Sequence, residues 1–360
     1  MKGLGRDVRF WLATSGILLL ILLATFRFQI AGQGCWIPFA PHEIPAEAKA
    51  FSPPSTVIQD LDTGEERVHK LGTDQLGRDV ASRLVHGTTI ALTVGIWSSL
   101  LSLFIAFLLG GLAGYVGDEK HRLSWLSIIV LLMGFLLVHF YGYEGSYVYE
   151  ISPRLIWSLP SFLFRSMVGI AIILFSVWVI EKFTKMGKVH IPWDTLVIKL
   201  MEVFMSMPRL FLLLAVFAII SKPSVLAVTI IIGCLRWPRL TRVVRAEVLS
   251  AKQESYVDSA KVMGLTDLSI YAKHILPNIY KPMLILTMLN IGTAILIESS
   301  LSFLHIGLPL TEVSWGRMLS DARDYIPAWW LAVGPGVMIF IAIISFNTIS
   351  QRLSHHFESK

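Results

Sequence analysis

Histidine and cysteine are the side chains in this sequence that could hold a metal ion or do redox chemistry, and their spacing favours neither role. A histidine pair occupies residues 355–356, and His139 and His305 lie in apolar stretches, without the HExxH motif or a comparable ligand spacing. Cys35 and Cys234 are far apart and form no CxxC motif. We therefore predict no metal site, no disulfide and no catalytic residue among these groups.

Two acidic residues lie in or beside apolar runs, where a charged side chain is costly and often functional. Glu202 follows Lys199 by three residues, so both can lie on one side of a helix, and we predict a structural ion pair there. Pro208 should bend the same helix. Glu298 has no charged neighbour in the sequence. It either lines a polar path or bonds to another helix, and both alternatives stay open.

Apolar residues dominate the composition. The chain has 360 residues, of which 54% are hydrophobic and only 16% charged, whereas about 25% are charged in an ordinary soluble domain. One globular core cannot hide this much apolar surface, so the sequence predicts a membrane protein. The net charge of +6 indicates basic cytoplasmic loops rather than a nucleic-acid partner.

The apolar runs predict an all-α, polytopic bundle of transmembrane helices. A helix needs ~20 mostly apolar residues to cross ~30 Å of hydrocarbon. Eight runs meet this requirement or come close to it. They cover about Phe10–Phe26, Ile90–Tyr115, Leu123–Tyr141, Phe162–Ile180, Leu196–Ile220, Val225–Leu240, Met283–Ile297 and Ala328–Phe346. We interpret the first as an anchor, because no small-residue cleavage site of a signal peptide follows it cleanly.

Lysine and arginine in the loops predict the orientation. With the amino terminus inside, the inner loops contain the basic groups of residues 120–122, 182–188 and 236–281, whereas residues 27–87 on the outside are balanced or acidic. Basic residues are enriched in cytoplasmic loops. Both termini are therefore expected in the cytoplasm.

A polar stretch on the predicted cytoplasmic side, residues 254–278, favours two short helices. Gly264 and the three residues after it interrupt the helical pattern, and Asp267 is expected to cap the second helix. Pro277 should end it. Held at both ends by membrane spans, such a segment could be a rigid lever that a partner pushes. The alternative is a solvated amphipathic loop.

The letters "YVDSAKVMG", followed by "HILPN", favour the lever. They resemble the EAA signature of ABC importer permeases, with Asp258, Ser259 and Ala260 in place of Glu-Ala-Ala and His274 in place of a hydrophobic residue. In that family the segment is the coupling helix that docks onto the ATP-hydrolysing subunit. The resemblance assigns ATPase coupling to Tyr256, Asp258, Ser259, Ala260, Gly264, Leu276 and Pro277.

Three further stretches resemble the dipeptide/oligopeptide permeases, and specifically their second, C-type membrane subunit. They are "LGTDQLGRDVASRLVHG", "WPRLTRVVRAEVLSAKQESYV" and "LIESSLSFLHIGLPLTEVSWGRMLSDAR". The last contains Glu298, which becomes the candidate for the transport path. The first supplies the family signature residues Gly72, Thr73, Asp74, Gly77, Arg78 and Asp79.

Two regions depart from the family pattern. The carboxyl end lacks the usual Gly-Asp-rich ending, and residues 118–191 add two spans where the family has a short connection. The predicted organisation is thus a six-helix core with an inserted two-helix hairpin. Its parts are an anchor and extracytoplasmic loop (1–87), the first core segment (88–117), the hairpin (118–191), the remaining core (192–350) with the coupling segment (254–277), and a cytoplasmic tail (351–360).

The resemblance implies a multi-pass subunit of an ATP-driven importer in the bacterial cytoplasmic membrane. Its partners would be membrane lipid, a homologous permease subunit, two ABC ATPases and an extracytoplasmic substrate-binding protein. The chain contains no GxxxxGK[ST] loop, so the ATPases would hydrolyse ATP and this chain would bind no cofactor. The expected substrates are di- or oligopeptides, with nickel chelates or sugars as alternatives. An ion-coupled transporter and a membrane enzyme are the rival classes. The first leaves the 254–278 stretch unexplained, and for the second the sequence offers no convincing set of nucleophile and base or of metal ligands.

Overall fold

The computed structural model describes ten stretches of the chain, which divide into two compact units. The first unit consists of residues 1–115 and 199–360, and the second of residues 116–198. The described residues are 7–32, 36–45, 48–59, 66–118, 122–124, 176, 188–190, 192–219, 224–309 and 311–358.

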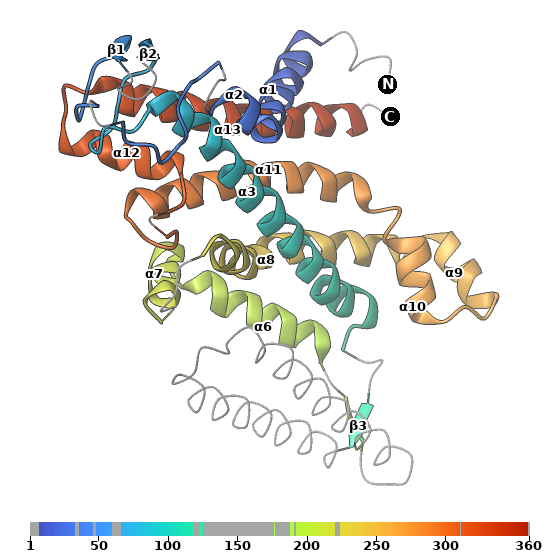
Figure 1. Cartoon of the computed structure of the whole chain (residues 1–360). Coiled ribbons are helices and arrows are strands. Elements are labelled where there is room, and N and C mark those ends of the chain that lie inside the picture. Colours follow the sequence, from blue (N-terminus) through green and yellow to red (C-terminus); the bar gives the residue numbers. More distant parts are fainter. Residues whose placement is uncertain are drawn as a thin grey trace. The chain divides into compact units, whose positions relative to one another are not determined.

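Helices make up most of the first unit, as predicted (Figure 1). A short antiparallel hairpin of β1 (Thr56–Gln59) and β2 (Glu66–His69), which the sequence did not predict, joins them. The helices are α1 (Val8–Thr25), α2 (Arg27–Ile30), α3 (Val80–Gly111), α7 (Arg209–Ile219), α8 (Val225–Ala251), α9 (Ser255–Val262), α10 (Asp267–Ile270), α11 (Tyr280–Phe303), α12 (Trp315–Asp324) and α13 (Trp329–Glu358). Two π-helical turns, η2 (Leu112–Val116) and η3 (Tyr271–Ile275), extend α3 and α10.

Four of the described helices are long and apolar enough to cross a membrane, namely α1, α3 with η2, α11 and α13. They confirm four of the predicted spans. The span predicted at Leu196–Ile220 is instead two helices, α6 (Trp193–Ser206) and α7, which meet at an angle of 87°. Pro208 lies in that break. It explains the break, because a proline has no backbone N–H to donate and its ring clashes with the preceding helical turn. The break is sharper than the predicted bend.

α8 begins at Val225, where a span was predicted, but it is not one of these apolar helices. Arg236, Arg239 and Arg242 lie in its middle. Its packing is nevertheless that of a core helix, since α3 and α8 contact each other more extensively than any other pair of described elements. The hydroxyl of Ser102 on α3 donates to the Gly233 carbonyl oxygen of α8 at 2.8 Å. Small residues at this crossing let the two backbones approach closely.

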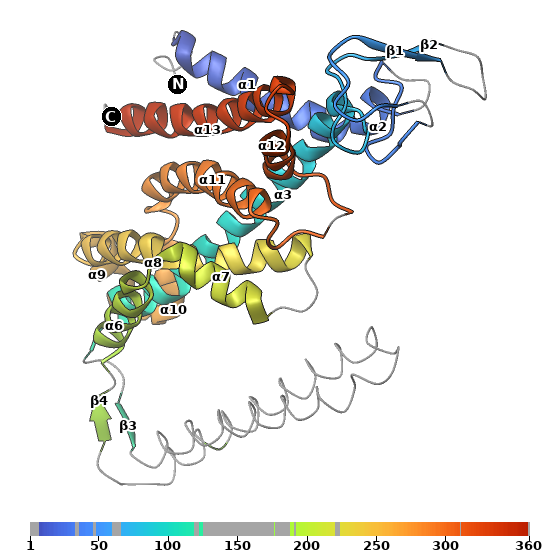
Figure 2. The same ribbon diagram turned by 90° about the vertical axis from the view of Figure 1, so that its left-hand side faces the viewer.

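The first unit has two opposite ends. Figure 2 shows β1, β2 and α2 at one end, and α9 and α10 toward the other. The start of α1 lies beside the last turns of α13, where the Asp7 carboxylate pairs with Arg352 at 2.7 Å. Both ends of the described chain therefore lie close together. Their assignment to the cytoplasm stays a prediction.

The second unit contains the inserted residues 118–191. Strands β3 (Arg122–Ser124) and β4 (Lys188–His190) pair antiparallel, so the two ends of the insertion meet. The Asp118 carboxylate accepts from the backbone N–H of Asp194 and Thr195 at 2.8 and 3.1 Å. Residues that flank the insertion are thus spatial neighbours.

Most of the two spans predicted inside the insertion lies outside the described residues. There are two exceptions. Ser176 in the second span is helical, as predicted, whereas residues 123–124 at the start of the first belong to strand β3 and not to a helix. Pairing with β4 explains this error, since a partner strand far along the chain fixes their extended backbone.

Candidate functional site

The candidate site is the segment from Tyr256 to Pro277, called the 256–277 segment below. It consists of α9, a turn at Gly264, α10 and η3. Gly264 has φ +75°, and a Cβ placed on it would meet nothing within 4 Å. Glycine is favoured here by the left-handed backbone alone, because that conformation strains any residue with a Cβ. This confirms the predicted break between two helices.

The cap of the second helix was predicted wrongly. Thr266, not Asp267, is the N-cap of α10, and its hydroxyl oxygen accepts from the Ser269 N–H at 3.4 Å. Thr266 has the extended backbone of a cap (φ −68°, ψ 151°), whereas Asp267 is already the first helical residue. The Asp267 carboxylate instead accepts from the Tyr115 hydroxyl at 3.0 Å. Asp267 therefore links α10 to Tyr115 of η2, the turn that extends α3, and does not cap its own helix.

Further polar contacts fasten the 256–277 segment to α3. The Tyr271 hydroxyl donates to the Phe107 carbonyl oxygen at 2.6 Å. Lys252, just before the segment, donates to the Tyr115 carbonyl oxygen at 2.9 Å. Burial raises the pKa of Tyr271 to about 12, so its hydroxyl stays a donor at neutral pH.

The inner face of the segment is fully buried. Side chains from α9, α10 and η3 pack in one apolar cluster with α8, where Val244 and Val248 are also buried. The segment is therefore a rigid extension of α3 and α8 rather than a solvated loop. Its buried members are Val257, Ala260, Ile270 and Ile275.

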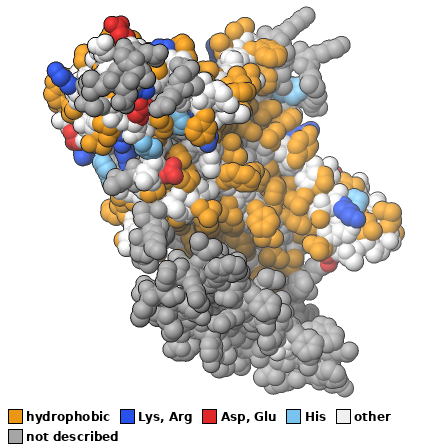
Figure 3. Space-filling view, in the orientation of Figure 1, with side chains coloured by type: hydrophobic (Ala, Val, Ile, Leu, Met, Phe, Trp, Pro, Cys, Tyr) orange, Lys and Arg blue, Asp and Glu red, His pale blue; other side chains and the backbone are white. Residues whose placement is uncertain are grey.

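The outer tip of the segment is apolar yet exposed. Val262 is 89% exposed and Leu268 77%, with Met263 beside them. In Figure 3 hydrophobic side chains extend over the lobe formed by α9 and α10. Asp258 lies nearby, in an exposed ion pair with Lys261 at 2.8 Å. An exposed apolar patch with a charged rim is typical of a surface that a partner covers.

The structure brings the sequence-predicted residues of this segment together but gives them different surroundings. Asp258, Ser259, Gly264 and Pro277 are exposed, whereas Ala260 is buried in the apolar cluster. Tyr256 and Leu276 are half-buried and pack against the same cluster.

The signature residues 72–79, called the 72–79 segment, lie at the opposite end of the unit. Gly72 and Gly77 have φ +76° and +81°, and a Cβ on Gly72 would lie 2.5 Å from the Ser52 carbonyl oxygen. The Asp79 carboxylate caps α3 by accepting from the Ser82 N–H at 2.7 Å, and it also contacts His69 Nδ1 at 2.9 Å. These residues fix the start of α3.

A buried ion cluster continues from this segment. The Asp74 carboxylate accepts from Arg78 Nε at 2.7 Å and from the buried Arg83 guanidinium. Arg83 also faces Asp321 of α12 at 3.3 Å. Burial raises the pKa of the Asp321 carboxyl above its usual value, and Arg83 opposes that shift. Asp321 was missed in the sequence, although it lies in one of the quoted stretches, because only the fold brings it to Arg83.

Glu298 is buried among hydroxyl groups, with only 1% of its surface exposed. One carboxylate oxygen accepts from Ser302 at 2.8 Å and from Ser314 at 2.7 Å. Ser314 is the N-cap of α12, accepting from the Gly316 N–H at 3.1 Å. Within the described residues Glu298 thus bonds to another element, one of the two predicted alternatives. A role in a transport path stays a prediction.

Comparison with known proteins gives a match to the carboxyl-terminal half of the chain. Residues 184–360, which include the whole 256–277 segment, match the family described as "Binding-protein-dependent transport system inner membrane component". The carboxyl-terminal half of the chain is thus similar to this family. Together with the four apolar helices, this similarity indicates a multi-pass inner-membrane protein.

Individual relatives are named as transport permeases. A Brucella suis protein named for a peptide transport system is 37% identical over 162 residues, which is 45% of this chain and 54% of the relative. The aligned part thus spans about half of that relative's length. The di/tripeptide permease protein of Pseudomonas aeruginosa is 27% identical over 96% of this chain and 87% of its own length. A Pectobacterium atrosepticum protein named for glutathione transport is 28% identical over 83% of this chain and 75% of its own.

The remaining predictions concern the Lys199–Glu202 pair and the histidine and cysteine side chains. Lys199 and Glu202 form the predicted pair, with 2.9 Å between Nζ and Oε2, and both side chains are exposed. Among the described residues no group of three or more His, Cys, Asp or Glu side chains could hold a metal ion. His139 and Cys35 lie outside the described residues.

Proposed function

We propose that this chain is one of two homologous membrane subunits of an ATP-driven ABC importer for di- or oligopeptides. Separate ATPases would bind the 256–277 segment, and an extracytoplasmic substrate-binding protein would deliver the peptide. The chain itself would catalyse no reaction and bind no cofactor, since the ATPases hydrolyse ATP. Both termini would lie in the cytoplasm with the 256–277 segment.

The geometry of the 256–277 segment carries this proposal. Its buried face is continuous with the cluster formed by α3 and α8, while Val262, Met263 and Leu268 are exposed at the tip. A partner that binds the tip would therefore move two core helices, because α9, which ends at the tip, has Val257 and Ala260 buried in the same cluster. The hydrogen bonds of Tyr115 and Tyr271 resist sliding of the segment over α3.

A sequence of steps follows from this rigidity. ATP binding would draw the two ATPases together, and the 256–277 segments of the two membrane subunits would move with them. α3 and α8 would then tilt, so the path between the membrane subunits would open outward to receive the peptide. Hydrolysis would reverse the movement.

The names of the relatives support a peptide substrate. They refer to peptides, to di/tripeptides and to glutathione, which is itself a small peptide. A sugar or a nickel chelate is not favoured by any of these names.

Purification of the native complex tests the proposal. A tag on this chain should recover a second membrane subunit and two ATPase subunits, and purified complex in liposomes should hydrolyse ATP faster with a peptide-loaded binding protein. Mass spectrometry of the bound solute would identify the substrate. Recovery of the chain without any ATPase, from cells that express the complete system, would contradict the proposal.

A further inference from the structure

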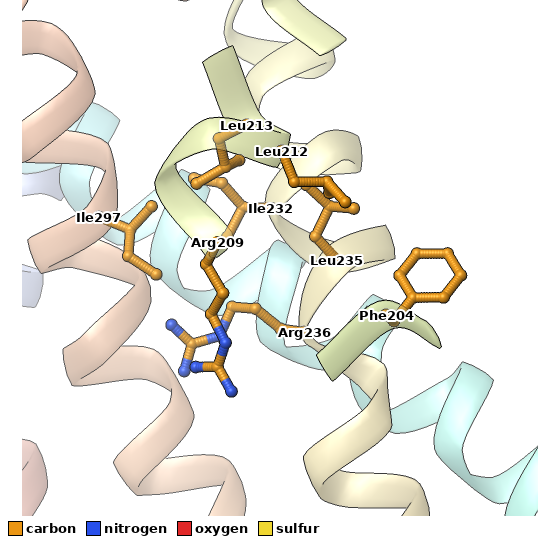
Figure 4. A pocket seen from close by; sticks show the side chains of 8 residues that line it. All are labelled: Phe204, Arg209, Leu212, Leu213, Ile232, Leu235, Arg236 and Ile297. Atoms are coloured by element: carbon orange, nitrogen blue, oxygen red, sulfur yellow. The ribbon is translucent and has the colours of Figure 1, made fainter. Parts of the chain in front are cut away.

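A small hollow that is partly open to the surface lies beside the helix break at Pro208, and its lining residues come from α6, α7, α8 and α11. Hydrophobic side chains provide six of the eight lining residues, and the other two are Arg209 and Arg236. Figure 4 shows both guanidinium groups on the same side of this hollow. They come from two different helices, so the pair is a product of the fold.

Arg236 is held in one orientation. Its Nε donates to the Asn290 side-chain oxygen of α11 at 2.7 Å, and its Nη2 donates to the Thr293 hydroxyl. Nη1 of Arg236 and the whole guanidinium of Arg209 make no hydrogen bond to any described residue. Nη1 of the fixed Arg236 guanidinium is therefore available to a ligand, and so is the guanidinium of Arg209.

No carboxylate among the described residues lies within 4.0 Å of either guanidinium. Arg209 and Arg239 instead place like charges near Arg236. Positive charges inside a membrane protein are costly and usually face a partner or a polar path. An anion between Arg209 and Arg236 would offset their repulsion, and a carboxylate matches the planar donor fork of arginine.

The depth of the hollow separates two possible sources of that anion. Asn290 is ten residues beyond Tyr280, the first residue of α11. A rise of 1.5 Å per residue puts it about 15 Å along the helix, which is about half of the ~30 Å hydrocarbon layer. Lipid headgroups lie at the surface of that layer, whereas a solute that crosses the membrane passes its middle.

We propose that this hollow binds a carboxylate, and that its ligand is the terminal carboxylate of a transported peptide. The apolar lining would contact the aliphatic part of the peptide, and the arginine pair would hold its charged end. The identification of the ligand as a transported peptide rests on the function proposed above. Binding of the carboxylate follows from the arginine pair itself.

Direct binding to the full-length chain in phosphatidylcholine nanodiscs tests this inference. Trialanine and trialanine amide would be titrated by calorimetry into the wild-type chain and its variants. Arg209→Gln is the main variant, because this exposed side chain has no described partner and its loss leaves the packing intact. Arg239→Gln is the matched control, being an exposed arginine on α8 that does not line the hollow.

We expect trialanine to bind the wild type and Arg239→Gln equally, and Arg209→Gln roughly tenfold or more weakly, as the loss of a charge-assisted hydrogen bond implies. Arg236→Gln should weaken binding similarly, and the amide should bind all proteins weakly. Equal binding of acid and amide, or unchanged binding to Arg209→Gln, would overturn the proposal.

A second set of titrations, in nanodiscs that contain an anionic lipid, tests whether the anion is a lipid headgroup. Nanodiscs with added phosphatidylglycerol should leave the affinity of the wild type for trialanine nearly unchanged. If phosphatidylglycerol displaces trialanine and stabilises the wild type but not Arg209→Gln, the arginines hold a lipid headgroup and the proposal is wrong. Cells whose peptide uptake is independent of this chain, with carboxylate binding intact, would contradict the proposed function while supporting the carboxylate site.

Discussion

The two ends of the first unit use polar residues in opposite ways. In the 72–79 segment the charged groups point inward, where Asp74 binds Arg78 and Arg83 within hydrogen-bonding distance. In the 256–277 segment Asp258 points outward and apolar side chains are exposed beside it. The residues that resemble the family thus form a buried ion cluster at one end and an exposed apolar tip with a charged rim at the other. Substitutions at the two ends should therefore fail in different ways.

Removal of Asp74 should have the largest effect. Asp74→Ala leaves the buried Arg83 without its nearest counter-charge, and breaking a buried ion pair in this way costs about 3–5 kcal/mol. Thermal unfolding of the purified chain should show a much lower midpoint, and less protein should accumulate in membranes. Asp324→Ala is the control, because its exposed ion pair with Arg323 at 4.0 Å contributes about 0–1 kcal/mol. Equal stability of both variants would mean that the 72–79 segment is not a structural core.

Gly264→Val should abolish transport while the chain remains inserted. A Cβ in the left-handed conformation costs about 1–2 kcal/mol, so the turn should rearrange and move the exposed tip. Gly336→Val is the matched control, since a Cβ there also meets nothing within 4 Å but Gly336 has no positive φ. Peptide uptake by cells and membrane content of the chain are the two measurements. Normal uptake by Gly264→Val would contradict the lever.

Asp258→Lys should reduce coupling less severely than the glycine variant. The new positive charge would face Lys261, the present ion-pair partner of Asp258, and would reverse the charge at the rim of the tip. We expect ATPase stimulation by the assembled membrane subunits to fall while unfolding temperature stays constant. Asp258→Asn should show a smaller decrease, and identical stimulation in both variants would exclude an electrostatic role.

Deletion of the insertion should have the smallest effect on transport. Ser124 pairs directly with Lys188, so an Asn-Gly turn could replace residues 125–187 and close the two strands as a hairpin. Asp118 would still hold the start of α6 through Asp194 and Thr195. We expect most peptide uptake to be retained. Complete loss in a complex that still binds its ATPases would show that the insertion belongs to the mechanism.

Local patterns in the sequence were sufficient for much of this protein. The lengths of apolar runs predicted four spans correctly, because bilayer thickness fixes the length of a crossing helix. Spacing by three residues predicted the Lys199–Glu202 pair, and a lone glycine between helical stretches predicted the break at Gly264, where the backbone is left-handed. Each of these features depends on neighbours within one or two helical turns.

Only the tertiary structure decided the partners of the buried and membrane-embedded polar groups. Asp321 meets Arg83 across 238 residues of sequence, Asp267 meets Tyr115 across 152, and the hollow joins Arg209 of α7 to Arg236 of α8. Helical periodicity places such a side chain on a face of its own helix but does not identify the helix that packs there. That choice is made when the helices close together, because each buried polar group must then find its hydrogen-bond partner on whichever element lies beside it.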